Sequence, residues 1–132
     1  MERTIINFKE DYFYPGEHTS SAISGILYLA GFLCIDVGSS VDYIKKAFND
    51  PSEQKYEWGY GGYSHIEQNG NNISIGFAID QFHETPGAPV FTLTLKQMNY
   101  ILDRWKEALE KKPNKIVITK HDNDEITVDF EE

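Results

Sequence analysis

The sequence is poor in cysteine, in cations and in long apolar runs, and each shortage excludes a class of protein. Cys34 is the one cysteine in 132 residues, so the chain can form neither an internal disulfide nor a thiolate metal cage. Its 12 Lys and Arg residues face 21 Asp and Glu residues, a net charge of −9. This balance disfavours autonomous nucleic-acid binding, because neutralising phosphates requires an excess of cations.

The longest apolar stretch, residues 23–35, contains Ser24 and two glycines and is too short to span a bilayer. The N-terminus lacks the apolar segment and the small-residue cleavage site of a secretory signal. We therefore expect a cytoplasmic protein. Within that apolar stretch, Cys34 is expected to be a buried small hydrophobic residue rather than a reactive thiol.

The chain does contain enough apolar and aromatic surface to fold. Hydrophobic residues make up 40% of it and aromatic residues 14%, which argues against disorder despite a mean hydropathy of −0.47. The length fits one domain over residues 1–132, with a core that needs no cross-links.

Two segments in the first half have helical spacing. The first is expected to start at a serine N-cap at 20–21 and to stop at Gly31. The second is expected to start at a serine N-cap at 39–40 and to end before Pro51.

A third helix gives the clearest pattern in the sequence. Residues 94–97 form a capping box, and Pro113 marks the end. Apolar residues recur three and four positions apart between them: Leu95, Met98, Leu102, Trp105 and Leu109.

Alternating apolar residues predict strands in the remaining segments. A turn at 71–72 separates two of these strands, and a turn at 122–124 divides a C-terminal hairpin. The expected strands cover residues 4–8, 64–68, 73–79, 90–93, 116–119 and 126–130. Because runs of strands are segregated from helices, the sequence predicts an α+β fold, with a mainly antiparallel sheet and about three helices.

Motifs for catalysis or metal binding are absent. The four histidines match no zinc signature by their spacing, and each is expected to be an ordinary histidine; they are His18, His65, His83 and His121. No nucleophile elbow or Cys–His arrangement is recognisable. We expect a protein without enzymatic activity, cofactor or metal.

Glycines and aromatic residues cluster at 58–64. The cluster is not a phosphate-binding loop, since no Lys-Ser or Lys-Thr closes it and Glu57 and Glu67 flank it. A loop that presents Tyr60 and Tyr63 to a protein partner fits better, because rings beside glycines supply contact area at small entropic cost. The alternative is that these rings pack into the core, which we expect for Trp58.

Charge is distributed unevenly along the chain. Residues 85–120 contain seven bases and three acids, a sum of +4, so the remaining residues sum to −13. Acids concentrate at 48–84 and at 121–132, and Asp42 is expected to extend this acidic field. Two interpretations are open: a solvated surface that aids solubility, or a docking face for a basic protein.

Several stretches resemble a known family, and they span roughly residues 20–120. They are Tyr28–Asp36, Tyr43–Pro51, Tyr56–Glu67 and Leu93–Trp105, the last followed by Lys112–Pro113. Their overall pattern is similar to that of immunity proteins of bacterial contact-dependent growth inhibition systems (the CdiI type). The resemblance implies a small cytoplasmic protein that binds one cognate toxin domain one-to-one, commonly a nuclease, and blocks its basic cleft.

Our first hypothesis is therefore a toxin-neutralising immunity protein. Charge and expected exposure, rather than a family motif, select its contact residues: Glu57, Tyr60, Tyr63, Glu67, Asp80 and Glu84. The alternative is a small hydrolase or carbohydrate-binding module that uses the aromatic loop at 57–67 with His65 or His83. A third possibility is an adaptor domain for another protein partner.

Overall fold

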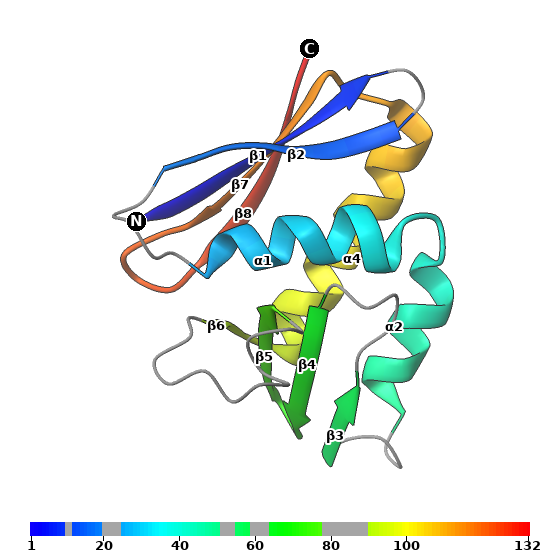
Figure 1. Ribbon diagram of the computed structural model, residues 1–132, viewed down its shortest axis with the longest axis vertical. Helices are drawn as coiled ribbons and strands as arrows, with labels where there is room; N and C mark the ends of the chain where they lie inside the picture. The colour runs from blue at the N-terminus through cyan, green and yellow to red at the C-terminus, as the bar shows by residue number, and fades with distance from the viewer. Residues whose placement is uncertain (10–11, 20–24, 51–54, 59–63, 78–89) are drawn as a thin grey trace.

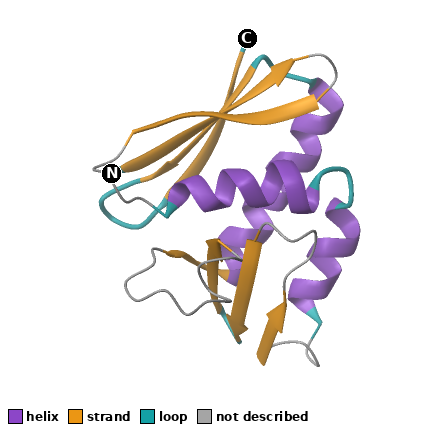
Figure 2. Cartoon of the chain, in the orientation of Figure 1, coloured by secondary structure: helices purple, strands orange, loops and turns teal. Residues whose placement is uncertain are grey.

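The computed structural model describes residues 1–9, 12–19, 25–50, 55–58, 64–77 and 90–132. The chain has the predicted α+β fold, with two antiparallel sheets of four strands each instead of one (Figure 1). A central helix lies between the sheets, and a long helix passes behind both (Figure 2).

The first sheet has the strand order β2-β1-β7-β8. Its strands are β1 (Glu2–Lys9), β2 (Tyr12–Thr19), β7 (Lys115–Lys120) and β8 (Ile126–Glu131). The register pairs Ile6 with Ile116, and Thr4 with Ile118, so these buried side chains share the face that is turned to the helices.

The second sheet has the strand order β3-β4-β5-β6. Its strands are β3 (Lys55–Trp58), β4 (Ser64–Asn69), β5 (Asn72–Phe77) and β6 (Val90–Thr94). Alternation directs Ile66, Ile75 and Phe91 into the core, and the intervening residues form the outer face.

The helices are α1 (Ile26–Gly31), η1 (Phe32–Val37, a π-helix), α2 (Val41–Asn49) and α4 (Leu95–Lys111). The α1–η1 segment contributes the buried residues Leu29, Phe32 and Leu33 to a core shared by both sheets. Along the described chain, no single helix is both long and apolar enough to cross a membrane; the pair α1–η1 and α2, bent by 115°, meets those criteria only when joined.

The second and third predicted helices are confirmed. Ser40 is the N-cap of α2, which ends at Asn49 as expected before Pro51. In α4 the complete capping box is present, with Thr94 Oγ1 accepting from the Gln97 N–H and Gln97 Oε1 accepting from the Thr94 N–H.

The predicted bounds of the first helix are wrong at both ends. Gly25 is the N-cap, and the serines at 20–21 lie outside the described residues. At Gly31 the helix does not stop but continues into η1 and ends at Gly38, whose φ of +50° favours glycine. Gly31 is buried in this continuous helical segment, so burial outweighs its helix-breaking tendency.

Two further differences from the sequence-based predictions concern the strands. The β4–β5 turn consists of Gly70 and Asn71, one residue earlier than predicted, because the left-handed φ of +61° needs a glycine. Sequence reasoning missed β2, which contains Pro15 and Gly16; both are tolerated because β2 is an edge strand with a register shift.

Candidate functional site

The six predicted contact residues lie on, or between, the strands of the second sheet along the chain. Four lie outside the described residues: Tyr60, Tyr63, Asp80 and Glu84. Of Glu57 only the backbone position on β3 is described, whereas the side chain of Glu67 is exposed on β4. The register makes Glu57 and Glu67 direct cross-strand partners. The structure thus brings together two of the six positions.

The described residues around Glu67 on the outer face of the second sheet form a small depression. His65, Glu67 and Ser74 border a depression of about 10 Å³ there. A cavity needs roughly 10–15 Å³ to hold one water molecule. This part of the face therefore suits contact with a large partner better than enclosure of a small substrate.

Gln68 fixes the position of β4 beneath that face. Its side chain is 3% exposed and donates to the carbonyl oxygens of Phe48 at 2.9 Å and Gly70 at 3.2 Å. The first bond ties β4 to the C-terminal end of α2. Sequence reasoning missed this residue, although its alternation with the buried Ile66 was a usable signal.

The two histidines whose side chains are described, His65 and His121, lie in hairpins of different sheets. His65 is half-buried on β4, and His121 lies in the β7–β8 turn, where its Nε2 is 3.0 Å from Thr127 Oγ1. The side chains of His18 and His83 lie outside the described residues. In the part of the chain that is described, no three His, Cys, Asp or Glu residues are placed to hold a metal ion.

The acidic C-terminal segment forms the β7–β8 turn and strand β8. Its acids are exposed: Asp122, Asp124, Glu125, Asp129, Glu131 and Glu132. The N-terminal ammonium donates to Asp122 Oδ1 at 2.5 Å, and this hydrogen bond lowers the pKa of Asp122. The N-terminal ammonium group therefore offsets one of these six negative charges.

Asp42 is exposed, but it does not extend the acidic field as expected. Lys106 Nζ donates to its Oδ1 at 3.0 Å, and that hydrogen bond raises the pKa of Lys106. One turn along, Lys45 donates to Asp103 at 2.6 Å, so cations of one helix offset the acids of the other. The α2–α4 surface is consequently mixed in charge.

A second site, which the sequence did not suggest, is an apolar pocket of about 260 Å³. It lies between the β1–β2 hairpin, η1 and the C-terminal end of α4. Its described lining includes Phe8, Phe13, Cys34, Trp105, Leu109 and Lys112. No residue spacing indicates it, because its lining comes from three regions that are distant in the sequence, at residues 8–13, 34–39 and 105–112.

Three aromatic rings in contact form one wall of this pocket. The Phe8 and Phe13 ring centroids are 4.7 Å apart, and those of Phe13 and Trp105 are 4.9 Å apart. Trp105 is 2% exposed, and its Nε1–H donates to the Gly38 carbonyl oxygen at 2.8 Å. Since its N–H is already used, the indole offers the pocket only apolar ring surface.

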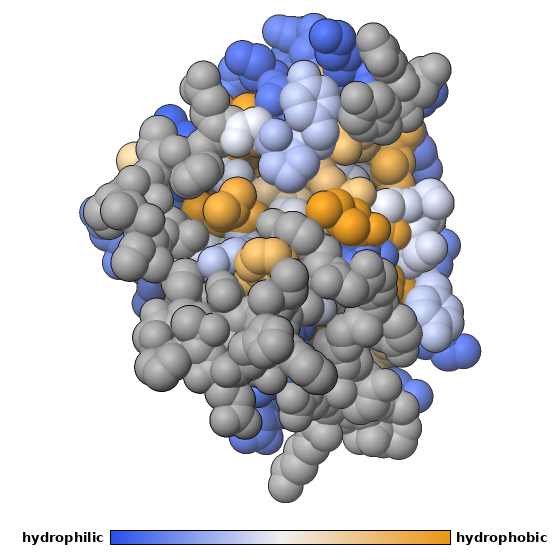
Figure 3. Space-filling view, in the orientation of Figure 1, coloured by the Kyte–Doolittle hydropathy of each residue, from blue (hydrophilic) through white to orange (hydrophobic). Residues whose placement is uncertain are grey.

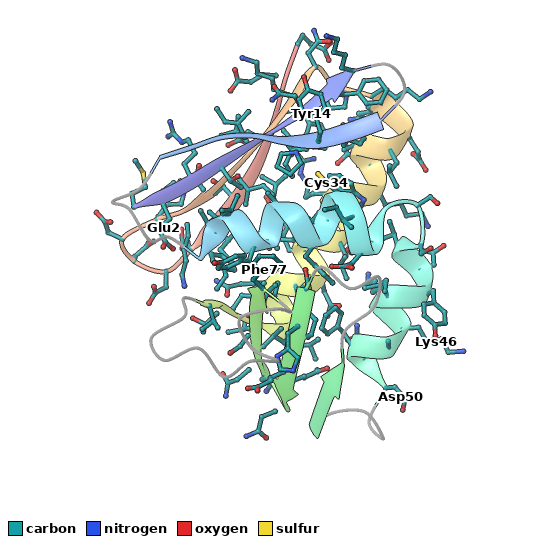
Figure 4. All side chains as sticks on the ribbon, viewed as in Figure 1. Glu2, Tyr14, Cys34, Lys46, Asp50 and Phe77 are labelled. Atoms are coloured by element: carbon teal, nitrogen blue, oxygen red, sulfur yellow. The ribbon has the colours of Figure 1, made fainter. Side chains whose placement is uncertain are left out.

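Cys34 extends from η1 toward the first sheet (Figure 4). It is half-buried, and burial raises its pKa to about 12. The thiol is therefore neutral at physiological pH, as expected for a small hydrophobic residue rather than a reactive thiol.

Exposed hydrophobic residues lie on the helices as well. Hydrophobic side chains gather over α1 and η1 in the middle of the view in Figure 3. Ile35 on η1 is 53% exposed and Tyr43 on α2 is 63% exposed. Tyr43 was detectable from the sequence, because it falls off the apolar face formed by Val41, Ile44 and Phe48.

Comparisons with known proteins found no match: no family model fits the sequence, and no curated protein or solved structure is significantly similar to it.

Proposed function

We propose that this chain is a cytoplasmic immunity protein that binds one cognate bacterial toxin domain and blocks it without turnover of its own. The proposal rests on the resemblance of four stretches to CdiI-type immunity proteins and on the acidic excess of the chain. The small size of the depression beside Glu67 supports a protein partner rather than a small substrate.

The observation that carries the proposal is the pairing of Glu57 with Glu67. Like charges at directly opposite positions destabilise an antiparallel sheet. Positions that violate a local rule in this way are most often functional ones. The register places two acidic residues at opposite positions of β3 and β4, and a basic partner would complement that pair.

The proposed mechanism is occlusion of a basic cleft. Carboxylates on the outer face of the second sheet speed the encounter with a positively charged surface, such as one that grips nucleic acid. In this proposal Tyr60 and Tyr63 then anchor the complex by burial. A toxin held in this way cannot bind its own polyanionic substrate.

The first step of the test is to read the gene adjacent to this chain; if it encodes a large exoprotein, the C-terminal domain of that exoprotein is the toxin to use. Glu67→Lys should lower the association rate about tenfold or more at low salt and abolish growth rescue on co-expression. Asp129→Lys is the matched control, since it also reverses an exposed acidic charge, on β8 of the other sheet.

If both variants bind the toxin domain as fast as the wild type at every salt concentration, the acidic face is not the contact surface. If the wild type neither binds nor rescues, the chain is not the immunity protein of that toxin. Loss of a measurable turnover in His65→Ala, with binding intact, would instead identify an enzyme.

A further inference from the structure

The pocket between the β1–β2 hairpin, η1 and α4 is separate from the proposed toxin contact. None of its described lining residues belongs to the predicted contact set. Its volume of about 260 Å³ exceeds the roughly 150 Å³ at which an apolar cavity in a protein accepts benzene. The space therefore suffices for one aromatic ring with a short side chain.

The aromatic wall of the pocket is preorganised by contacts within the protein. The Trp105 indole is held by its hydrogen bond to Gly38 and by the Phe13 ring. The Gly38 carbonyl reaches Trp105 from the end of η1, where the Gly38 N–H donates to the Leu33 carbonyl oxygen at 2.9 Å in the wide turn of a π-helix. Preorganised walls lower the entropic cost of binding.

The polar groups of the pocket favour one charge type. Lys112 is exposed and is the one cation among the described lining residues, which include no carboxylate although the chain has 21 acids. Cys34 and Ser39 add only neutral groups. The carbonyl end of α4 lies beside Lys112 and would repel an anion, so attraction of an anion depends on this ammonium group.

We propose that this pocket binds a small amphipathic carboxylate, with its ring or short alkyl chain between Phe13, Trp105 and Leu109 and its carboxylate at the Lys112 ammonium. Apolar burial supplies the affinity, and the charge selects a carboxylate over an alcohol or an amine of the same skeleton. The proposal is independent of toxin binding.

The test compares three probes with one skeleton: 3-phenylpropionate, 3-phenylpropan-1-ol and 3-phenylpropylamine. Trp105 fluorescence is recorded in a Trp58→Phe background, and the amide NMR shifts of Gly38 and Ser39 are recorded in the unmodified chain. The carboxylate should bind saturably and about tenfold more tightly than the alcohol, and the amine should bind most weakly.

Lys112→Gly is the decisive variant. Lys112 has a φ of +51°, which glycine adopts freely, so the variant should fold while losing the ammonium group. The Lys112→Gly protein should bind 3-phenylpropionate only as tightly as it binds 3-phenylpropan-1-ol. Its affinity for the alcohol should equal that of the wild type. Lys111→Gln is the matched control, because Lys111 pairs with Glu107 and is not among the lining residues.

Leu109→Phe, which fills the pocket, should weaken both the carboxylate and the alcohol. The proposal is overturned if the three probes bind equally, if Lys112→Gly leaves the carboxylate affinity unchanged, or if the Gly38 and Ser39 amides do not respond to any probe.

Discussion

Gly25 shows how closely two elements of this fold approach each other. A Cβ atom at this position would lie 2.4 Å from the Val90 carbonyl oxygen and 2.7 Å from the Phe91 nitrogen. The backbone φ of −68° is ordinary, so the requirement for glycine is purely steric. The start of α1 can rest on the β6 backbone only because no side chain intervenes.

We therefore predict that Gly25→Ala destabilises the protein by about 1–3 kcal/mol, because the clash is with rigid backbone. The free energy of urea-induced unfolding measures the effect. Gly70→Asn is the control, since open space surrounds Gly70 and asparagine tolerates its left-handed φ. A Gly25→Ala protein as stable as the wild type would contradict the close approach of α1 and β6.

The thiol of Cys34 gives a second test at the residue scale. Its pKa is raised from 9.0 to about 12, so at pH 8 iodoacetamide should modify the native protein about 1,000-fold more slowly than the urea-unfolded chain. Below pH 9 the thiol is protonated in both states, so its contribution to stability is fully present and does not change with pH. Between pH 9 and 12 only the unfolded thiol ionises, so its contribution to stability is lost as the pH rises.

Cys34→Ala removes this contribution, so the stability difference between wild type and variant should shrink above pH 9. Equal alkylation rates in the native and unfolded chains would show that the thiol is accessible.

At the scale of elements, α4 covers the open edge of the first sheet. The Arg104 guanidinium donates to the Val128 carbonyl oxygen from Nη2 at 2.9 Å and from Nε at 3.2 Å, and it lies 4.1 Å from the Phe130 ring centroid. Tyr100 Oη accepts from the Val128 N–H at 3.2 Å. Satisfying both groups of Val128 protects β8 from pairing with another chain.

We predict that Arg104→Lys lowers the free energy of unfolding by about 1–3 kcal/mol. A lysine ammonium group can neither donate two hydrogen bonds to the Val128 carbonyl oxygen in the guanidinium geometry nor stack flat on the Phe130 ring. Thermal or urea unfolding measures the loss. Lys106→Gln removes the exposed pair with Asp42 and should cost less than about 1 kcal/mol. Equal losses in the two variants would mean that the bonds of Arg104 contribute no more than a surface ion pair.

At the scale of the whole molecule, a few polar contacts join segments that are distant in the sequence. Lys120 at the end of β7 donates to the Thr92 carbonyl oxygen at 3.0 Å, which links the first sheet to β6 of the second. Nearby, the N-terminal ammonium binds Asp122 across 121 residues of chain.

The contact of the N-terminus predicts a specific titration. The pKa of Asp122 is lowered by the hydrogen bond from the ammonium group, so its stabilising contribution is present above the ordinary value of 3.8 and is lost as the pH falls. NMR titration should show the lowered pKa, and N-terminal acetylation should return it toward 3.8. The raised pKa of Lys106 should not respond to acetylation, which serves as the control.

The elements that local chemistry specifies are already readable in the amino-acid sequence. Helix α4 follows from its capping box and apolar periodicity, and the β7–β8 hairpin follows from alternation and a polar turn. The acidic excess, which motivates the proposed basic partner, is also a property of composition alone.

Only the tertiary structure decided the rest, because it depends on contacts between distant segments. The continuation of the first helix through Gly31 results from its burial between two sheets, and β2 exists because β1 supplies its hydrogen bonds. The pairing of Glu57 with Glu67 is fixed by strand register, and the apolar pocket is formed where three separate regions of the chain meet. Neither leaves a periodic or compositional signal in the chain, since each arises where folding brings independent elements together.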